Sequence, residues 1–227
     1  MKAIKIITIL LLTNVCFTFA QNINWNSLPD DQLNLVYFNF GYDFGITTQL
    51  GYGHQLSTTR PIMLLSDFCI PMGKDLIDDY KFRAGAQMRI LNRKSFSLSA
   101  KFFGIIRKQQ TKMVSLNNFG SELSVIAGIY KSNWHLSAEL GFDKSLATHS
   151  KHSELLKNEY AAIQDGWFVS SGGQFFYGIQ GSKTVGQKME LTTRVGATDA
   201  QGNDENALLP FYFQMGITYK FLPNGNI

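Results

Sequence analysis

The sequence predicts an all-β fold: an antiparallel, up-and-down transmembrane β-barrel of about ten strands, with 8 to 12 possible. Three observations carry this prediction: segments in which apolar and polar residues alternate strictly, short connections that alternate with long ones, and aromatic residues at or near the segment ends. Successive side chains of a strand point to opposite faces, so each segment has one apolar and one polar face. A membrane barrel turns the apolar face to lipid.

The first 20 residues have the pattern of a secretory signal peptide. Lys2 and Lys5 precede an apolar run, and small residues lead up to Ala20, after which we expect cleavage. Removing the two lysines from the 21 basic residues leaves 19 against 17 acidic ones, a charge that gives no indication of a nucleic-acid partner. Cys69 is then the only cysteine, so no internal disulfide is expected.

The first alternating stretch runs from residue 34 to residue 55 without a change of parity. One strand of this length would extend about 70 Å at roughly 3.3 Å per residue, longer than a bilayer requires. We therefore place a three-residue turn at Asp43-Phe44-Gly45, which reverses the chain and preserves the parity. The next strand covers residues 62–70 and ends at Pro71.

The clearest alternation lies between Tyr80 and Arg107. The even positions from Tyr80 to Ile90 are apolar or aromatic, and the odd positions are polar, charged or glycine. After a turn at 92–94, the pattern resumes at Phe96. This stretch is therefore predicted to be a hairpin with one wholly apolar face.

Five further alternating segments complete the predicted barrel, and they cover residues 122–129, 134–143, 175–179, 189–197 and 209–221. The short connections are at 92–94, 131–133 and 183–187, and the long ones at 73–79, 108–120, 145–172 and 199–206. Short periplasmic turns and long external loops are typical of outer-membrane barrels. An even strand count places both termini in the periplasm and leaves no exposed strand edge.

Aromatic residues are expected to form belts at the two membrane interfaces. The residues at or near strand ends are Tyr42, Phe44, Tyr80, Phe96, Trp134, Phe142, Phe175, Tyr219 and Phe221. With the signal, the alternation and the loop asymmetry, the chain resembles the small Gram-negative outer-membrane β-barrels as a class, over roughly residues 33–221. The resemblance implies contact with outer-membrane lipid and with the assembly machinery that reads the last strand, although Phe221 is not the final residue.

The predicted organisation is a signal peptide at 1–20, a periplasmic lead-in at 21–32, a barrel at 33–221 and a C-terminal tail at 222–227. The soluble alternative is a secreted lipocalin-like barrel or sandwich, which would pack its aromatic face inward. So many phenylalanines on ten strands would overfill such an interior.

Charged residues on the polar faces are expected to line the lumen. Basic residues lie on adjacent strands and acidic residues further round, so the two walls could meet in a narrow barrel. We predict a structural network of ion pairs, because an unpaired buried charge is costly; the alternative is a narrow, water-filled channel. The predicted network consists of Lys81, Arg83, Arg89, Lys101, Arg107, Glu122, Glu139, Asp143, Glu190 and Arg194.

The longest predicted loop holds the only weak catalytic candidates, His149 and His152, with Asp143 at the neighbouring strand end. Histidine with serine and an acid suggests acyl transfer or proteolysis, and two histidines three residues apart can share a metal. No motif of the outer-membrane proteases or acylases is present. We therefore expect no metal, no cofactor and no enzyme, and keep a rim-sited hydrolase or acylase as an alternative.

The same loop offers a binding surface. Ser153 is predicted to cap a short helix whose apolar stripe includes Leu155, Leu156 and Tyr160. Such a helix folds down as a lid over the barrel mouth, or it docks a partner protein or glycan with Trp167 and Phe168 as stacking surfaces. The sequence thus predicts an integral outer-membrane barrel with a structural, binding or small-solute role.

Overall fold

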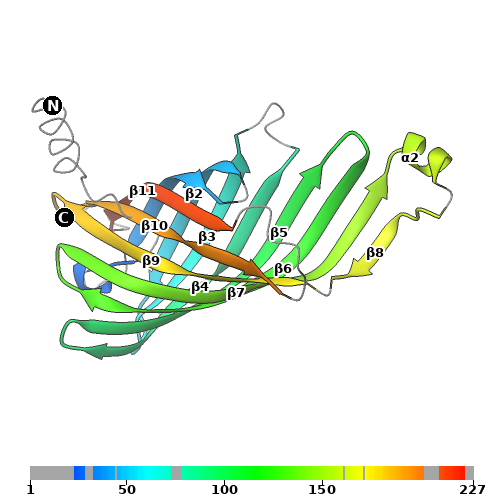
Figure 1. Cartoon of the computed structure of the whole chain (residues 1–227). Helices are drawn as coiled ribbons and strands as arrows, with labels where there is room; N and C mark the ends of the chain where they lie inside the picture. The colour runs from blue at the N-terminus through cyan, green and yellow to red at the C-terminus, as the bar shows by residue number, and fades with distance from the viewer. Residues whose placement is uncertain are drawn as a thin grey trace, which may run out of the picture.

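A computed structural model shows a closed antiparallel β-barrel in which ten strands of the described residues form the wall (Figure 1). The structure describes residues 23–28, 33–43, 45–72, 78–160, 162–170, 172–201 and 210–222. The predicted signal peptide, Phe44 and all but the first residue of the predicted C-terminal tail lie outside these ranges.

The wall strands follow one another round the barrel in sequence order, and β11 pairs with β1 to close it. They are β1 (Asn34–Tyr42), β2 (Ile46–Leu56), β3 (Ile62–Pro71), β4 (Tyr80–Arg93), β5 (Phe96–Gln110), β6 (Val114–Tyr130), β7 (Trp134–His152), β9 (Gly173–Val185), β10 (Met189–Ala200) and β11 (Phe211–Phe221). The short strand β8 (Gly166–Val169) pairs with β7 beyond the barrel wall. The helical elements are η1 (Trp25–Ser27) and α2 (Glu154–Glu159), and no helix in the described ranges is long and apolar enough to cross a membrane.

Residues that alternate between apolar and polar in the sequence alternate between the outer and inner faces of the barrel wall. Phe102 and Leu140 point outward and are 58% and 61% exposed, whereas their neighbours Lys101 and Glu139 point inward and are 6% and 4% exposed. The same pattern recurs in the other wall strands. The arrangement with the aromatic face packed inward, which a soluble sandwich requires, is therefore wrong for this chain.

The turn predicted at residues 43–45 is confirmed. β1 and β2 form an antiparallel pair whose register joins Tyr42 to Ile46, and the Asp43 amide donates to the Gly45 carbonyl at 3.0 Å. Because the turn contains three residues, Phe40 and Thr48 stand opposite each other on one face. A continuous alternating stretch is thus folded into two strands.

The predicted long loop at 108–120 is mostly strand and that at 145–172 contains two strand segments, so here the sequence prediction was wrong. β5 and β6 are joined by only three residues between Gln110 and Val114, and β7 runs on to His152 beside β8. The apolar alternation ends earlier, but the antiparallel backbone pairing continues. We call residues 108–119 and 146–170, as far as they are described, the paddle; it projects beyond the barrel and carries α2 (Figure 1).

Aromatic rings pair on the wall near both barrel rims. At the end opposite the termini, Tyr42 stacks on Phe211 at 5.1 Å between ring centroids, and Phe142 contacts Phe175 at 4.6 Å. At the other end, the rings of Tyr219 and Phe221 lie 6.2 Å apart. The predicted residues Tyr42, Phe142, Phe175, Tyr219 and Phe221 thus lie near the rims, Phe211 was not predicted, and Phe44 lies outside the described residues.

Glycines on the inner face make room for rings from neighbouring strands. A Cβ at Gly51 would overlap the ring of Tyr37, and one at Gly178 or Gly196 would overlap Tyr212. At Gly51 the space is filled by the Tyr37 side chain and not by a neighbouring backbone. The Tyr37 ring and the Tyr212 hydroxyl end therefore lie close against the wall.

We predict that an arginine placed on the apolar outer face of the wall hinders membrane insertion. Phe102→Arg or Leu140→Arg should cost roughly 2 to 4 kcal/mol near the bilayer midplane, because a charge replaces an apolar group that faces lipid. Folding into lipid vesicles, followed by heat-modifiable gel mobility under urea titration, measures this cost.

The control is Val169→Arg, which changes an apolar side chain that is 90% exposed but lies on the paddle. This variant should fold as the wild type does. An equal loss of folding free energy in Val169→Arg and Leu140→Arg would contradict a lipid-facing outer wall.

Candidate functional site

The barrel interior contains three successive layers of side chains. A vestibule lies toward the paddle, a layer of closed ion pairs follows it, and an apolar plug fills the end near the termini. The charged layers are built by inward-pointing positions of several strands, whereas the plug adds Ile23 and Trp25 from the segment before β1, so residues far apart in sequence meet across the lumen.

Arg83 on β4 is the centre of the first closed ion-pair group. Its Nε and Nη2 donate to the two oxygens of Asp67 at 2.9 and 3.0 Å, and Nη1 donates to Glu122 at 3.0 Å. The Tyr37 hydroxyl donates to Asp67 at 3.0 Å. This group ties β1, β3, β4 and β6 together, and it includes Asp67, which the predicted network omitted.

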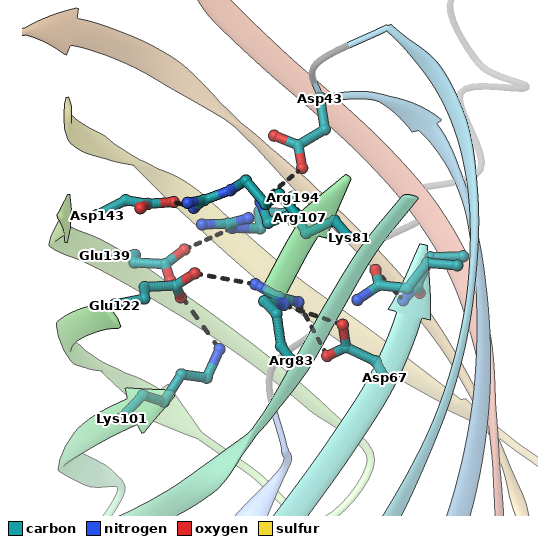
Figure 2. Close-up of polar contacts among 12 residues, drawn as sticks. Asp43, Asp67, Lys81, Arg83, Lys101, Arg107, Glu122, Glu139, Asp143 and Arg194 are labelled. Atoms are coloured by element: carbon teal, nitrogen blue, oxygen red, sulfur yellow. Dashed lines mark hydrogen bonds and ion pairs between the residues drawn. The ribbon is translucent and has the colours of Figure 1, made fainter. Parts of the chain in front are cut away.

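Glu139 on β7 is the centre of the second closed group. Arg194 Nε donates to Glu139 Oε2 at 2.7 Å, and Lys101 Nζ lies 4.0 Å from Oε1 (Figure 2). The Arg194 guanidinium also lies over the rings of Tyr212 and Phe176, at 4.4 and 5.1 Å from their centroids. Through these cation–π contacts, the two rings also shield the Arg194 guanidinium.

A more open tier of ion pairs lies above the two closed groups. Lys81 Nζ is 3.2 Å from Asp43 Oδ2, and Arg107 pairs with Asp143 and donates to Asn118 Oδ1 at 2.9 Å. The side chains of these two ion pairs are 12–27% exposed, against at most 8% for the closed groups. Solvent therefore reaches the upper tier and largely stops there.

The upper tier surrounds the vestibule, a cavity of about 460 Å³. Besides the charged groups, its lining includes Gln109, Ser145, Gln174 and Thr198, with Phe176 and Tyr212 contributing aromatic surface. A cavity of this size and polarity is typical of a site for a small polar molecule.

The end near the termini is closed by the segment that contains η1. Trp25 is 3% exposed, and its Nε1 donates to Ser99 Oγ at 3.0 Å. The side-chain amides of Asn24 and Asn26 donate to the carbonyls of Lys131 and Tyr130 at 2.9 and 2.8 Å. These bonds hold the segment inside the barrel end.

Sequence reasoning missed this plug. The plug packs in an apolar cluster formed by Ile23, Trp25, Leu35, Tyr37, Met63, Leu65, Phe103, Ile105 and Tyr130. The available signal was the inward parity of Leu35, Met63, Phe103 and Ile105, because apolar residues facing a lumen need something to cover them. A cavity of about 30 Å³ remains between the plug and the charged layer.

Two predicted network residues lie at the plug rather than among the other charges. The Arg89 guanidinium is 5.7 Å from the Trp25 ring centroid and donates to Asn26 Oδ1 at 3.4 Å. Glu190 pairs with Lys220 at 2.5 Å and contacts Ser182, whose hydroxyl lies 2.6 Å from His135 Nδ1. The predicted single network is thus divided between two levels of the barrel.

The structure does not bring the weak catalytic candidates together. The His149 ring packs edge-on against Trp167 at 5.0 Å, His152 Nδ1 lies 3.0 Å from Asp165 Oδ1, and Asp143 faces Arg107 in the vestibule. His149 and His152 are three apart on β7, and such residues point to opposite faces of a strand. No group of three metal-ligating side chains occurs within the described ranges.

The predicted helix is confirmed, since Ser153 caps α2 by accepting from the Leu156 amide at 3.3 Å. The lid interpretation is wrong: Leu155 and Tyr160 are 60% and 61% exposed, and no residue of α2 is buried. Trp167 and Phe168, the predicted stacking surfaces, are also exposed, at 63% and 50%.

Polar contacts hold α2 at the paddle tip, away from the barrel mouth. Lys157 Nζ lies 2.8 Å from Asp165 Oδ2, and the His152 amide donates to Asp165 Oδ1 at 2.7 Å. These two hydrogen bonds, first that from Lys157, hold the pKa of the Asp165 carboxyl below its ordinary value. The tip is therefore tied to β7 and cannot cover the vestibule in this arrangement.

No protein-family profile and no curated protein sequence matches the chain. Among solved structures, the KdgM porin in complex with oligogalacturonate is similar with a TM-score of 0.40 and 10% identity, covering 83% of this chain and 99% of the porin. The β domain of the Bordetella autotransporter BrkA is similar with a TM-score of 0.35 and 9% identity, over 83% and 98% of the two chains.

We predict that Arg83→Ala lowers barrel stability by about 3 to 5 kcal/mol, because it leaves Asp67 and Glu122 as buried carboxylates without their cation. The unfolding midpoint in guanidinium and the temperature at which the folded band disappears on a gel should both fall.

The matched control is Lys151→Ala, which removes a cation from an exposed paddle position. His149→Ala should likewise leave the barrel intact. Equal stability of Arg83→Ala and wild type would show that the closed ion pairs contribute nothing to the fold.

We also predict that Trp25→Ala destabilises the barrel by about 3 to 5 kcal/mol, because a fully packed indole leaves a cavity and Ser99 loses its donor. The measurement is equilibrium unfolding followed by the fluorescence of Trp134 and Trp167. A Trp25→Phe variant should recover most of the packing but not the hydrogen bond. If Trp25→Ala is as stable as wild type, the plug does not hold the barrel end.

Proposed function

We propose that the chain is an integral outer-membrane β-barrel that does not conduct and that presents a solvent-accessible vestibule on its outer side. The observation that carries this proposal is the inverted distribution of side chains, with apolar groups exposed on the outer wall and paired charges buried in the lumen. In water this arrangement would be unstable, and in a bilayer it is the arrangement that both faces require.

The membrane location is supported by the belts and by the closed wall. A continuous ladder leaves no backbone edge of the wall facing lipid, and aromatic pairs near both rims suit the two interfaces. We place the protein in the outer membrane of a Gram-negative envelope after cleavage near Ala20. β11, which ends in Tyr219 and Phe221, is the segment we expect the assembly machinery to recognise.

Two barriers in series support the closed state. The groups around Arg83 and Glu139 bridge strands on different sides of the lumen, and the plug below them is packed around Trp25. A solute crossing the barrel would have to displace both. Separating the buried ion pairs leaves each charge poorly solvated, so the charged layer resists opening. The narrow channel is therefore the less favoured function.

The rim-sited hydrolase gains no support from the geometry. A serine nucleophile needs a base within hydrogen-bond distance at an accessible surface, and His149 and His152 contact Trp167 and Asp165 instead. The Ser182–His135 contact does have that distance, but both side chains are at most 2% exposed at the plug level. A binding or structural role remains.

We predict that the purified protein in a planar bilayer shows no steady ohmic conductance. The Trp25→Ala variant should also remain silent, because the charged layer is still closed. The measurement is single-channel current at low and high salt, with a general porin as the positive control. Large, stable steps from the wild type, with ion selectivity that changes in Arg83→Ala, would establish the channel instead.

A further inference from the structure

We propose that the vestibule is a binding site for a small organic anion, a hydroxylated molecule with one carboxylate or phosphate group. The inference rests on the proposed orientation, which opens the vestibule to the outside. It names the class of solute that this cavity would hold.

The charges that line the vestibule are unequal. The lining contains five basic residues, Lys81, Arg83, Arg107, Lys108 and Arg194, and three acidic ones, Asp43, Glu122 and Asp143. The acids that complete the closed layer, Asp67 and Glu139, are only 3% and 4% exposed and are not part of the lining. A solute in the cavity therefore meets more cationic donors than carboxylates, although the closed ion-pair groups contain three basic and three acidic residues.

Lys81 and Arg107 mark the position that we propose for the anionic group. They are directly paired across β4 and β5, and both point inward. Like charges placed opposite each other on neighbouring strands repel. Their carboxylate partners approach from opposite sides, Asp43 from the β1–β2 turn and Asp143 from β7 (Figure 2).

An anion between Lys81 and Arg107 would remove this repulsion. Lysine offers three N–H donors and arginine five, so each cation can keep its carboxylate and still donate to a ligand. Carboxylate and phosphate oxygens form the strongest such bonds, and arginine binds them in a planar fork. The partial exposure of these two side chains, 12% and 22%, leaves them accessible.

The rest of the lining suits the body of such a ligand. Gln109, Gln174, Ser145 and Thr198 offer amide and hydroxyl groups for ligand hydroxyls, and Phe176 offers an apolar surface for ring carbons. The 460 Å³ cavity is within the range of small-molecule sites. A simple inorganic ion would use only the cationic pair, so it should bind more weakly.

The test is isothermal titration calorimetry on the folded full chain in detergent. The probes are glucose 6-phosphate and gluconate as anions, glucose as the neutral counterpart, and inorganic phosphate as the anion without a body. We expect saturable binding of at least one organic anion, at least tenfold tighter than glucose and tighter than inorganic phosphate. Higher salt should weaken it, because solvent ions reach these partly exposed charges and screen the attraction.

The variants locate the site. Lys81→Gln combined with Asp43→Asn removes the cation without stranding its carboxylate, and Arg107→Gln combined with Asp143→Asn does the same for the second pair. Each double variant should lower the affinity at least tenfold while the barrel keeps its heat resistance. Lys151→Gln removes a lysine charge outside the vestibule and should leave the affinity unchanged.

Failure of this inference is distinct from failure of the proposed function. Absence of saturable binding by both organic anions, binding of glucose as tight as that of the anions, or equal affinity in the double variants and wild type would each overturn the anion site. None of these results would make the barrel conduct. The two organic anions separate a carboxylate preference from a phosphate preference.

Discussion

Closure of the hydrogen-bond ladder is the constraint on which the rest of this structure depends. The pairing of β1 with β11 leaves the wall without a free edge, so every wall strand has a neighbour on both sides. Once the wall is closed, its pleat divides all side chains into an outer and an inner set. The outer set suits lipid, and the inner set must satisfy its own charges in a space with little water.

That interior requirement explains the layers. A barrel of ten strands encloses more volume than ion pairs alone occupy. Paired charged side chains fill the lumen at mid-height, and an apolar plug fills one end. The plug comes from outside the wall strands, which is why Trp25 can cover inward apolar residues from several of them. Only the upper part, around Lys81 and Arg107, stays open enough to receive a solute.

The paddle follows a different rule, because it extends beyond the barrel wall. Its strands persist through backbone pairing, while exposed aromatic residues such as Trp167 are supported by Phe119 and His149. The contacts of Asp165 with Lys157 and His152 fix α2 at the tip. Within the described residues, α2 therefore leaves the vestibule uncovered.

The sequence by itself determined the wall: period-two alternation is a local property, so strand parity, the turn at residues 43–45 and the aromatic belts could be read directly from it. It also placed Arg83, Glu122, Glu139 and Arg194 on the inner face. Partner choice was decided only by the tertiary structure, because shear between strands, and not parity, sets the heights at which inward side chains meet across a lumen. For that reason Asp67 joins Arg83, Arg89 joins the plug, and Ser99, which reads as an ordinary lumen position, becomes the acceptor for Trp25.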